Sequence, residues 1–154
     1  MKAAKPVKGN VLPGIKQYCA YQERCHAEVR EKLRSFDISD QKVEEIMAQL
    51  IEENYLNEER FAIQFAGSKF RMKNWGKIKI KYALQKRQVN EYCINKAINA
   101  IDEADYFRTF NKLITQKINS LKAEPNRLVK KRKLFDYLLQ KGYEYEMVSK
   151  VKVQ

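Results

Sequence analysis

Basic side chains at short intervals are the groups in this chain best suited to chemistry with a partner. One group comprises Lys69, Arg71, Lys73, Lys77, Lys79, Lys81, Lys86 and Arg87, and a second comprises Lys130, Lys131, Arg132 and Lys133. Several of these residues are three, four or seven positions apart, which places positive charges in stripes along a helix. Phosphate contacts need only positive charge within reach and carry no sequence information. We therefore take these residues as candidate contacts for DNA or another polyanion.

The net charge of the chain points to the same kind of partner. It is +12, unevenly distributed: residues 1–36 carry +5, residues 37–67 carry −6, residues 68–106 carry +5 and residues 107–154 carry +8. An excess of this size, clustered on either side of an acidic block, favours a polyanion, with nucleic acid as the first candidate. The alternative is a solvated basic face that only keeps the protein soluble.

The sequence does not assemble a catalytic site. Its pairs of adjacent glutamates (residues 44–45, 52–53 and 58–59) point about 100° apart on a helix, so the two carboxylates of a pair do not converge on a substrate. His26 is the only histidine, and no serine or cysteine nucleophile accompanies it in a known pattern. The glycines form no phosphate-binding loop. We expect neither enzymatic activity nor a cofactor.

Cysteine usage and hydropathy indicate the cellular compartment. Cys19, Cys25 and Cys93 are odd in number and form no Cys-x-x-Cys pair, which favours reduced thiols over disulfides or a metal site. No apolar run approaches the roughly 20 residues of a membrane span, and the N-terminus lacks the apolar segment of a secretory signal. Coiled-coil heptads are missing as well. We expect a soluble, cytoplasmic, monomeric protein without metal.

An internal repeat organises the elements that must position the basic residues. Shifted by 51 and then by a further 54 residues, the sequence aligns with itself without gaps, and apolar positions recur in three copies. They are Val29/Ile80/Leu134, Leu33/Leu84/Leu138, Ile38/Val89/Tyr143, Val43/Ile94/Val148 and Ile46/Ala97/Val151. The first two positions are four residues apart and the last two are three apart, as on two successive helices. The pattern predicts a repeat of about 50 residues.

Residues 77–82 allow two interpretations. Lysines alternate there with apolar and aromatic residues, which is the period of a half-buried strand. The aligned segments around Val29 and Leu134 lack this alternation and have helical spacing. Because aligned copies should share a fold, we predict a helix here too, with Ile80, Leu84 and Val89 in the core. Side-by-side packing of this helix with the one that carries residues 130–133 would join the two basic groups into one band.

The composition agrees with a helical repeat. Glycine and proline are few, and good helix formers are many. We predict an all-α protein of three tandem three-helix repeats stacked into an elongated, curved array. The repeats cover residues 15–54, 55–101 and 102–154 after a flexible basic tail at residues 1–14. Ser39, Asn57 and Asn90 should cap helices, and Gly142 should follow one with positive φ.

Aromatic residues divide into two predicted groups. Those at helical spacing are expected in the core: Phe61, Phe65, Phe107 and Phe110. Those at the ends of elements are better candidates for surface contacts: Tyr21, Tyr55, Trp75 and Tyr145.

Four segments of the chain resemble RecX regulatory proteins. Residues 21–33 resemble the opening segment of that family, Arg-x-Ser-x-x-Glu-Leu-x-x-Lys-Leu. Residues 55–62, Tyr-Leu-Asn-Glu-Glu-Arg-Phe-Ala, are similar to Tyr-Leu-Asp-Asp-x-Arg-Phe-Ala, which is the most specific match. Residues 76–84 fit Gly-x-x-Arg-Ile-x-x-Glu-Leu, and residues 138–143 fit the closing Arg-Arg-Gly-Phe segment. The resemblance covers about residues 16–151.

A few positions depart from the family pattern. Cys25 replaces the usual serine, and Ala83 replaces the usual glutamate. Asp37 and Gln88 stand where the family often has glycine, which only Gly142 keeps. These are turn and surface positions, so the departures leave the fold prediction unchanged.

The resemblance implies a function that the residues by themselves leave open. RecX proteins are tandem three-helix repeats that bind the RecA recombinase and its filament on DNA and generally inhibit its recombinase and ATPase activity. Similarity to them implies such a regulator here, active in DNA repair, recombination and the SOS response, with no catalytic centre and no cofactor. Two other functions fit the residues: a freestanding nucleic-acid-binding helical module that acts without RecA, and a helical scaffold for another acidic protein.

Overall fold

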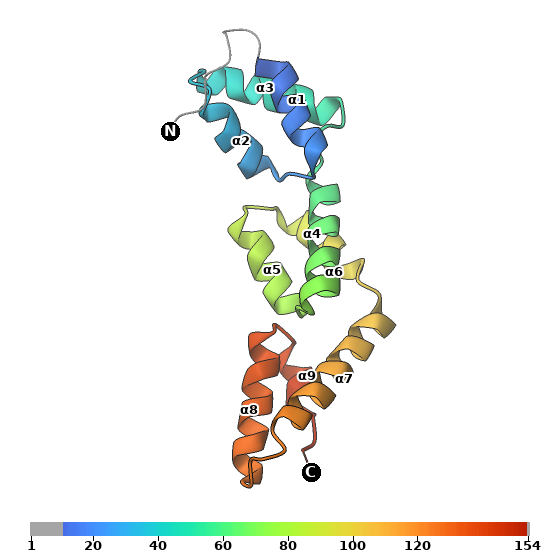
Figure 1. The fold of residues 1–154 in the computed structure, drawn as a ribbon. Helices are drawn as coiled ribbons and strands as arrows, with labels where there is room; N and C mark the ends of the chain where they lie inside the picture. Colours follow the sequence, from blue (N-terminus) through green and yellow to red (C-terminus); the bar gives the residue numbers. More distant parts are fainter. Residues whose placement is uncertain (1–10, 154) are drawn as a thin grey trace.

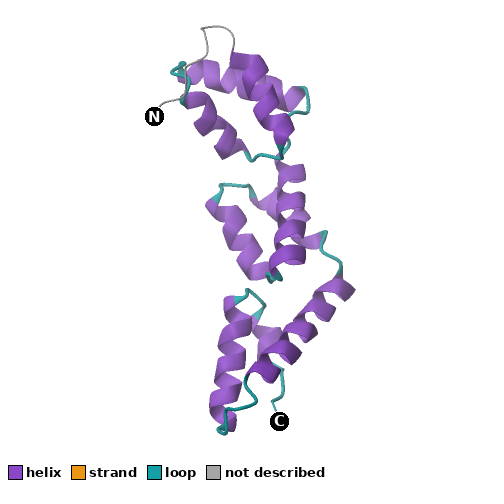
Figure 2. Cartoon of the chain, in the orientation of Figure 1, coloured by secondary structure: helices purple, strands orange, loops and turns teal. Residues whose placement is uncertain are grey.

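The computed structural model describes residues 11–153, and all the regular structure within them is helical (Figure 1, Figure 2). The helices are α1 (Val11–Tyr21), α2 (His26–Arg34), α3 (Asp40–Glu52), α4 (Glu58–Lys73), α5 (Lys77–Lys86), α6 (Glu91–Asn99), α7 (Glu103–Ser120), α8 (Arg127–Gln140) and α9 (Tyr145–Ser149). They follow one another as three groups of three in an elongated array, which confirms the predicted all-α fold (Figure 1). None of these helices is long and apolar enough to cross a membrane.

The N-terminal boundary differs from the prediction. Residues 11–14, expected in the tail, form the first turn of α1, while residues 1–10 lie outside the described part of the chain. Val11, Ile15 and Cys19 are spaced four apart on one face of α1, and all three are buried. Pro13 is tolerated because the amides of a first turn have no partner within the helix. The apolar spacing therefore extends the helix one turn earlier.

The repeated apolar positions are the centre of each three-helix group. Val29, Ile80 and Leu134 are fully buried on α2, α5 and α8, and so are the residues four positions later, Leu33, Leu84 and Leu138. Residues 77–82 are therefore helical, as the repeat predicts, and their strand-like alternation does not decide the structure. Ser39, Asn57 and Asn90 cap α3, α4 and α6 by accepting backbone N–H bonds, as predicted.

The turn after the middle helix of each group contains a residue with positive φ in all three copies. Asp37, Gln88 and Gly142 have φ values of 62°, 61° and 99°. These are the aligned positions at which the family often has glycine, and the left-handed region favours glycine because a Cβ is strained there. Two of the three copies keep this conformation without glycine, so the turn is imposed by the packing on either side of it.

The apolar side chains form two cores. One belongs to the first three helices, and the other runs through the remaining six. Three residues cross the boundary: Leu56, just before α4, packs in the first core, while Cys25, just before α2, packs in the second core and Ala27 on α2 packs against it. The core of each set of helices therefore includes an apolar residue from the other set.

The aromatic predictions hold in part. Phe61 and Phe110 are buried in the second core and Phe65 packs against it, as expected, but Phe107 is 50% exposed. It follows the buried Tyr106 directly, and adjacent helical residues point about 100° apart, so the face of α7 that buries Tyr106 turns Phe107 away from the core.

Candidate nucleic-acid interface

The predicted basic residues come from three helices. Lys69, Arg71 and Lys73 occupy the end of α4; Lys77, Lys79, Lys81 and Lys86 lie on α5, with Arg87 as its C-terminal cap; and residues 130–133 lie in the first half of α8. The structure brings members of the α4 and α5 groups together and leaves the α8 group at a distance from them.

Lysine and arginine side chains alternate with two aromatic rings across α4 and α5. The Lys69 ammonium lies 5.4 Å from the centre of the Phe65 ring and 5.2 Å from that of Trp75. The Arg87 guanidinium lies 4.6 Å from the Phe65 ring, and the Lys79 ammonium lies 4.8 Å from the Trp75 ring. We call this run of five side chains, Arg87–Phe65–Lys69–Trp75–Lys79, the α4–α5 strip. Its cations are within the range of cation–π attraction to the rings.

The strip is a concentration of positive charge. Burial lowers the pKa of Lys69 below its usual value, and the charges of Lys73 and Arg87 lower that pKa further. Among the described residues, no carboxylate forms an ion pair with Lys69, Lys73 or Arg87. Like charges gathered without a counter-charge are unfavourable in the free protein, and such perturbed groups cluster at functional sites.

Three of the predicted contact residues are already paired within the chain. The ammonium groups of Lys77, Lys81 and Lys133 lie 3.4, 3.5 and 3.7 Å from the carboxylates of Glu103, Glu91 and Glu124. At least one partner of each pair is exposed, so the pairs contribute little to stability. They nevertheless make these lysines less available to a partner than the cations of the strip.

The two basic helices do not pack side by side, contrary to the single band considered from the sequence. The start of α5 meets the end of α8: the Gly76 N–H donates to the Lys141 carbonyl (2.7 Å), and the Ile78 N–H donates to the Gly142 carbonyl (2.9 Å). Figure 1 shows α8 and α5 following one another along one edge of the array. The basic groups of α5 and α8 are therefore separated along this edge. End to end, the two helices extend for roughly 36 Å at 1.5 Å per residue.

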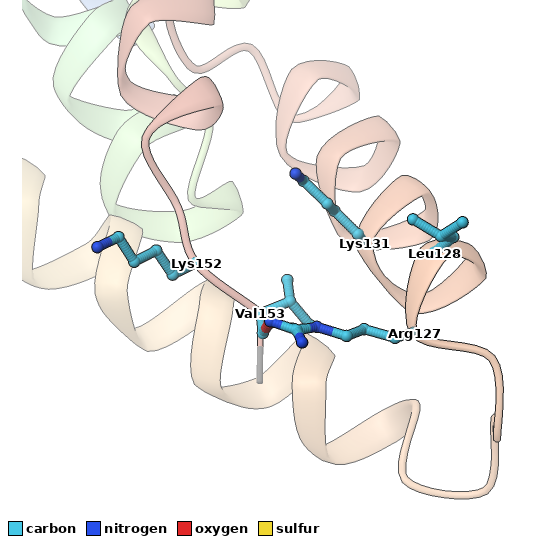
Figure 3. Close-up of a pocket in the computed structure, with 5 residues that line it drawn as sticks. All are labelled: Arg127, Leu128, Lys131, Lys152 and Val153. Carbon is cyan, nitrogen blue, oxygen red and sulfur yellow. The ribbon is translucent and has the colours of Figure 1, made fainter.

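A pocket near the end of the chain contains basic residues that the sequence patterns did not single out. It has a volume of about 530 Å³ and is lined by Arg127, Leu128, Lys131, Lys152 and Val153 (Figure 3). The Arg127 guanidinium crosses it and donates to the Val153 carbonyl at 2.8 and 3.1 Å. Of this set only Lys131 was predicted as a contact residue. Arg127 and Lys152 are 25 residues apart in sequence, so only the fold reveals that they line one pocket.

Comparisons with known proteins give the family. Residues 57–98 match the model of the second three-helix domain of RecX, and residues 103–151 match that of the third. The regulatory protein RecX of Clostridium perfringens is 34% identical over 125 residues, which is 80% of this chain and 58% of that protein. The chain belongs to the RecX family.

Other RecX proteins agree with this assignment. RecX of Chlorobaculum tepidum is 25% identical over 92% of this chain and 85% of that protein. The crystal structure of RecX from Lactobacillus salivarius superposes with a TM-score of 0.82 at 24% identity, covering 90% of this chain and 89% of that one, and therefore shares its fold. The chain spans about 58% of the length of the Clostridium perfringens relatives it matches.

The most RecX-like segment of the sequence, residues 55–62, lies between the first two helix groups. Leu56 enters the first core and Asn57 caps α4. A Glu58 carboxylate oxygen accepts the His26 N–H at 3.0 Å, so this glutamate caps α2. The Arg60 guanidinium donates to Glu23 at 2.6 Å and to the side chain and carbonyl of Asn54 at 3.1 and 3.2 Å. The segment that best resembles RecX thus joins two units of the fold, and we assign it a structural role.

Proposed function

We propose that this protein regulates the RecA recombinase by binding the RecA filament on DNA, and that it lowers recombinase and ATPase activity. Membership of the RecX family carries this proposal, because the matched domains cover most of the described chain. The role belongs to DNA repair and recombination, including the SOS response, in the cytoplasm. We propose that the protein acts as a monomer, with repeat boundaries after residues 54 and 101.

The shape and charge of the protein support a filament as the target. An elongated array with basic residues on consecutive helices offers contacts over a long path, and a DNA-bound filament presents negative charge over a comparable length. The elongated shape does not specify the partner by itself, since a solvated basic face would also satisfy it. Within the described part of the chain no carboxylate forms an ion pair with a cation of the α4–α5 strip, which favours a binding role over simple solubility.

An ATPase assay tests the proposal. Purified RecA on single-stranded DNA is mixed with this protein at increasing ratios up to stoichiometric amounts, and ATP hydrolysis is followed. We expect hydrolysis to fall as the ratio rises. Unchanged hydrolysis at stoichiometric protein, with both proteins folded, would contradict the proposal.

The alternative is a nucleic-acid-binding module that acts without RecA. It predicts that salt-sensitive binding to bare DNA accounts for any effect on RecA. A pull-down with RecA, with and without DNA, at two salt concentrations separates the two functions. Retention of RecA without DNA supports the regulator. Retention that requires DNA and is lost on charge reversal of residues 130–133 supports the module.

A further inference from the structure

We propose that the α4–α5 strip binds single-stranded nucleic acid, with phosphates held by its cations and unstacked bases held against Phe65 and Trp75. This deepens the proposed function and rests on it, because it assigns one surface of the regulator to the nucleic-acid strand. The other basic group, on α8, is left for the remaining contacts.

The two rings are fixed platforms. Phe65 and Trp75 both pack against the second core while remaining partly exposed, so their positions are set by buried neighbours. The Lys69 ammonium lies 5.4 Å from the centre of the Phe65 ring and 5.2 Å from that of the Trp75 ring. The two ring centres are therefore at most 10.6 Å apart. This is roughly three times the 3.4 Å rise per base along one strand. A short stretch of a single strand can therefore reach both rings.

The cations can change partners without a large cost. Cation–π contacts at exposed sites are weak, and a phosphate is a stronger partner for an ammonium or guanidinium group. When a strand arrives, Lys69 and Lys79 can move from the rings to its phosphates and leave the ring faces to the bases. Phosphate also relieves the crowding of positive charge around Lys69, which the fold itself leaves uncompensated.

The aromatic rings decide which polyanion fits. Base–aromatic stacking requires bases that are not already stacked in a duplex, and it tolerates any sequence. The carboxylates of an acidic protein would satisfy the cations but would make no use of the ring faces. Aromatic rings interleaved with cations are the combination found in proteins that bind single strands.

The single tryptophan of the chain reports on the strip directly, since it is Trp75. We expect its fluorescence to be quenched when the whole protein is titrated with oligo(dT), in the absence of RecA and at low salt. A duplex of equal length at equal phosphate concentration should quench much less, and poly-glutamate should not quench. Equal quenching by poly-glutamate or by the duplex would overturn the proposal.

Two variants separate stacking from charge. Lys69→Ala should weaken oligo(dT) binding and reduce the slope of log K against log salt by about 0.7, as expected for one lost phosphate contact to a single strand. Phe65→Leu retains apolar bulk but loses the flat face, and should lower affinity about tenfold or more. Because Phe65 packs against the core and Lys69 is half-buried, the melting curves of both variants are compared with that of the unmodified protein.

Lys96→Ala is the matched control. Lys96 on α6 also lies over a ring, 5.5 Å from the centre of Tyr92, but no second ring adjoins it there. Its removal should leave oligo(dT) binding nearly unchanged, and equal loss in Lys96→Ala and Lys69→Ala would overturn the proposal. The RecA ATPase assay is run in parallel. Inhibition without quenching would contradict single-strand binding by the strip but not RecA regulation. Quenching without inhibition would contradict RecA regulation but not single-strand binding by the strip.

Discussion

The two junctions between helix groups use aligned positions and different chemistry. Cys25 precedes α2 at the first junction, and Gly76, 51 residues later, precedes α5 at the second. The Cys25 side chain is fully buried in the second core. At Gly76 there is no room for any side chain, because a Cβ would overlap the carbonyl group of Gly142.

Hydrogen bonds between backbone groups close the second junction, and tyrosine side chains support them. The N–H groups of Gly76 and Ile78 reach the carbonyls of residues 141 and 142, and the Lys77 N–H donates to the Tyr106 hydroxyl at 2.9 Å. That hydroxyl in turn donates to Glu144. The positive end of the α5 dipole thus meets the negative end of α8, so the open ends of the two helices satisfy one another.

Side chains make the first junction. The carboxylate of Glu58, only 8% exposed, takes the place of a partner helix at the start of α2, and Arg60 links Glu23 to Asn54. A side-chain cap needs no close approach of two backbones. This explains why the position of Gly76 can be a cysteine in the first copy.

The difference indicates that α1–α3 form one cooperative unit and α4–α9 form another. One core runs through the last six helices, and an aromatic chain with ring centres 5.1–5.8 Å apart links Phe70, Tyr106, Tyr143 and Phe110 across their junction. The first three helices have a core of their own. We expect α4–α9 to unfold as one unit and α1–α3 to open separately.

The largest effect is expected at Gly76, where the backbone before α5 meets the backbone after α8. Gly76→Ala should destabilise α4–α9 by about 3 kcal/mol, because the obstructing atoms are backbone and cannot rotate away. Thermal unfolding and hydrogen exchange in α8 measure it. Gly14→Ala is the control: its Cβ meets no atom within 4 Å, so stability should be unchanged or slightly higher. Equal melting of the two variants would show that the junction is loose.

The second-largest effect is a loss of stability at the second junction at alkaline pH. Burial raises the pKa of both Tyr106 and Tyr143, with further increases from the neighbouring Glu144 carboxylate. The unfolded chain therefore loses these protons near pH 10 while the folded chain keeps them, so stability present below pH 10 is lost as pH rises. The loss reaches about 1.4 kcal/mol per tyrosine at pH 11. Denaturant unfolding between pH 8 and 11 measures the slope, which Tyr106→Phe should reduce.

At neutral pH, Tyr106→Phe should cost about 2 kcal/mol, since it leaves the Lys77 N–H without its acceptor and removes the donor to Glu144. Chemical denaturation provides the measurement. Tyr145→Phe serves as the control, because Tyr145 is largely exposed. A cost in the control as large as that of Tyr106→Phe would argue against the hydroxyl as the link.

The smallest effect belongs to the first junction. Glu58→Gln keeps the size of the side chain and weakens the charge-assisted bond to the His26 N–H, so we expect a loss of about 1 kcal/mol. Hydrogen exchange should increase in α2 and remain unchanged in α8. Increased exchange in α8 would show that the two units are coupled more tightly than their separate cores suggest.

Much of this architecture could be predicted from the sequence, because it depends on local spacing repeated three times. Val29, Ile80 and Leu134 mark the middle helix of each group. The caps at Ser39, Asn57 and Asn90 follow from residue type and position. The family resemblance likewise rests on short, continuous segments of the sequence. The basic residues were also visible, since charge clusters on α5 and α8 are local.

The joining of the units could not be predicted in this way. The end-to-end contact of α5 with α8 brings together residues more than 60 positions apart, and the Cys25–Gly76 contrast has meaning only once the neighbouring backbone is in place. Arg87 reaches the Phe65 ring, 22 positions earlier in the sequence, only because α5 packs against α4. Periodicity fixes which face of a helix is buried, but the contacts between helix ends are decided by packing in three dimensions.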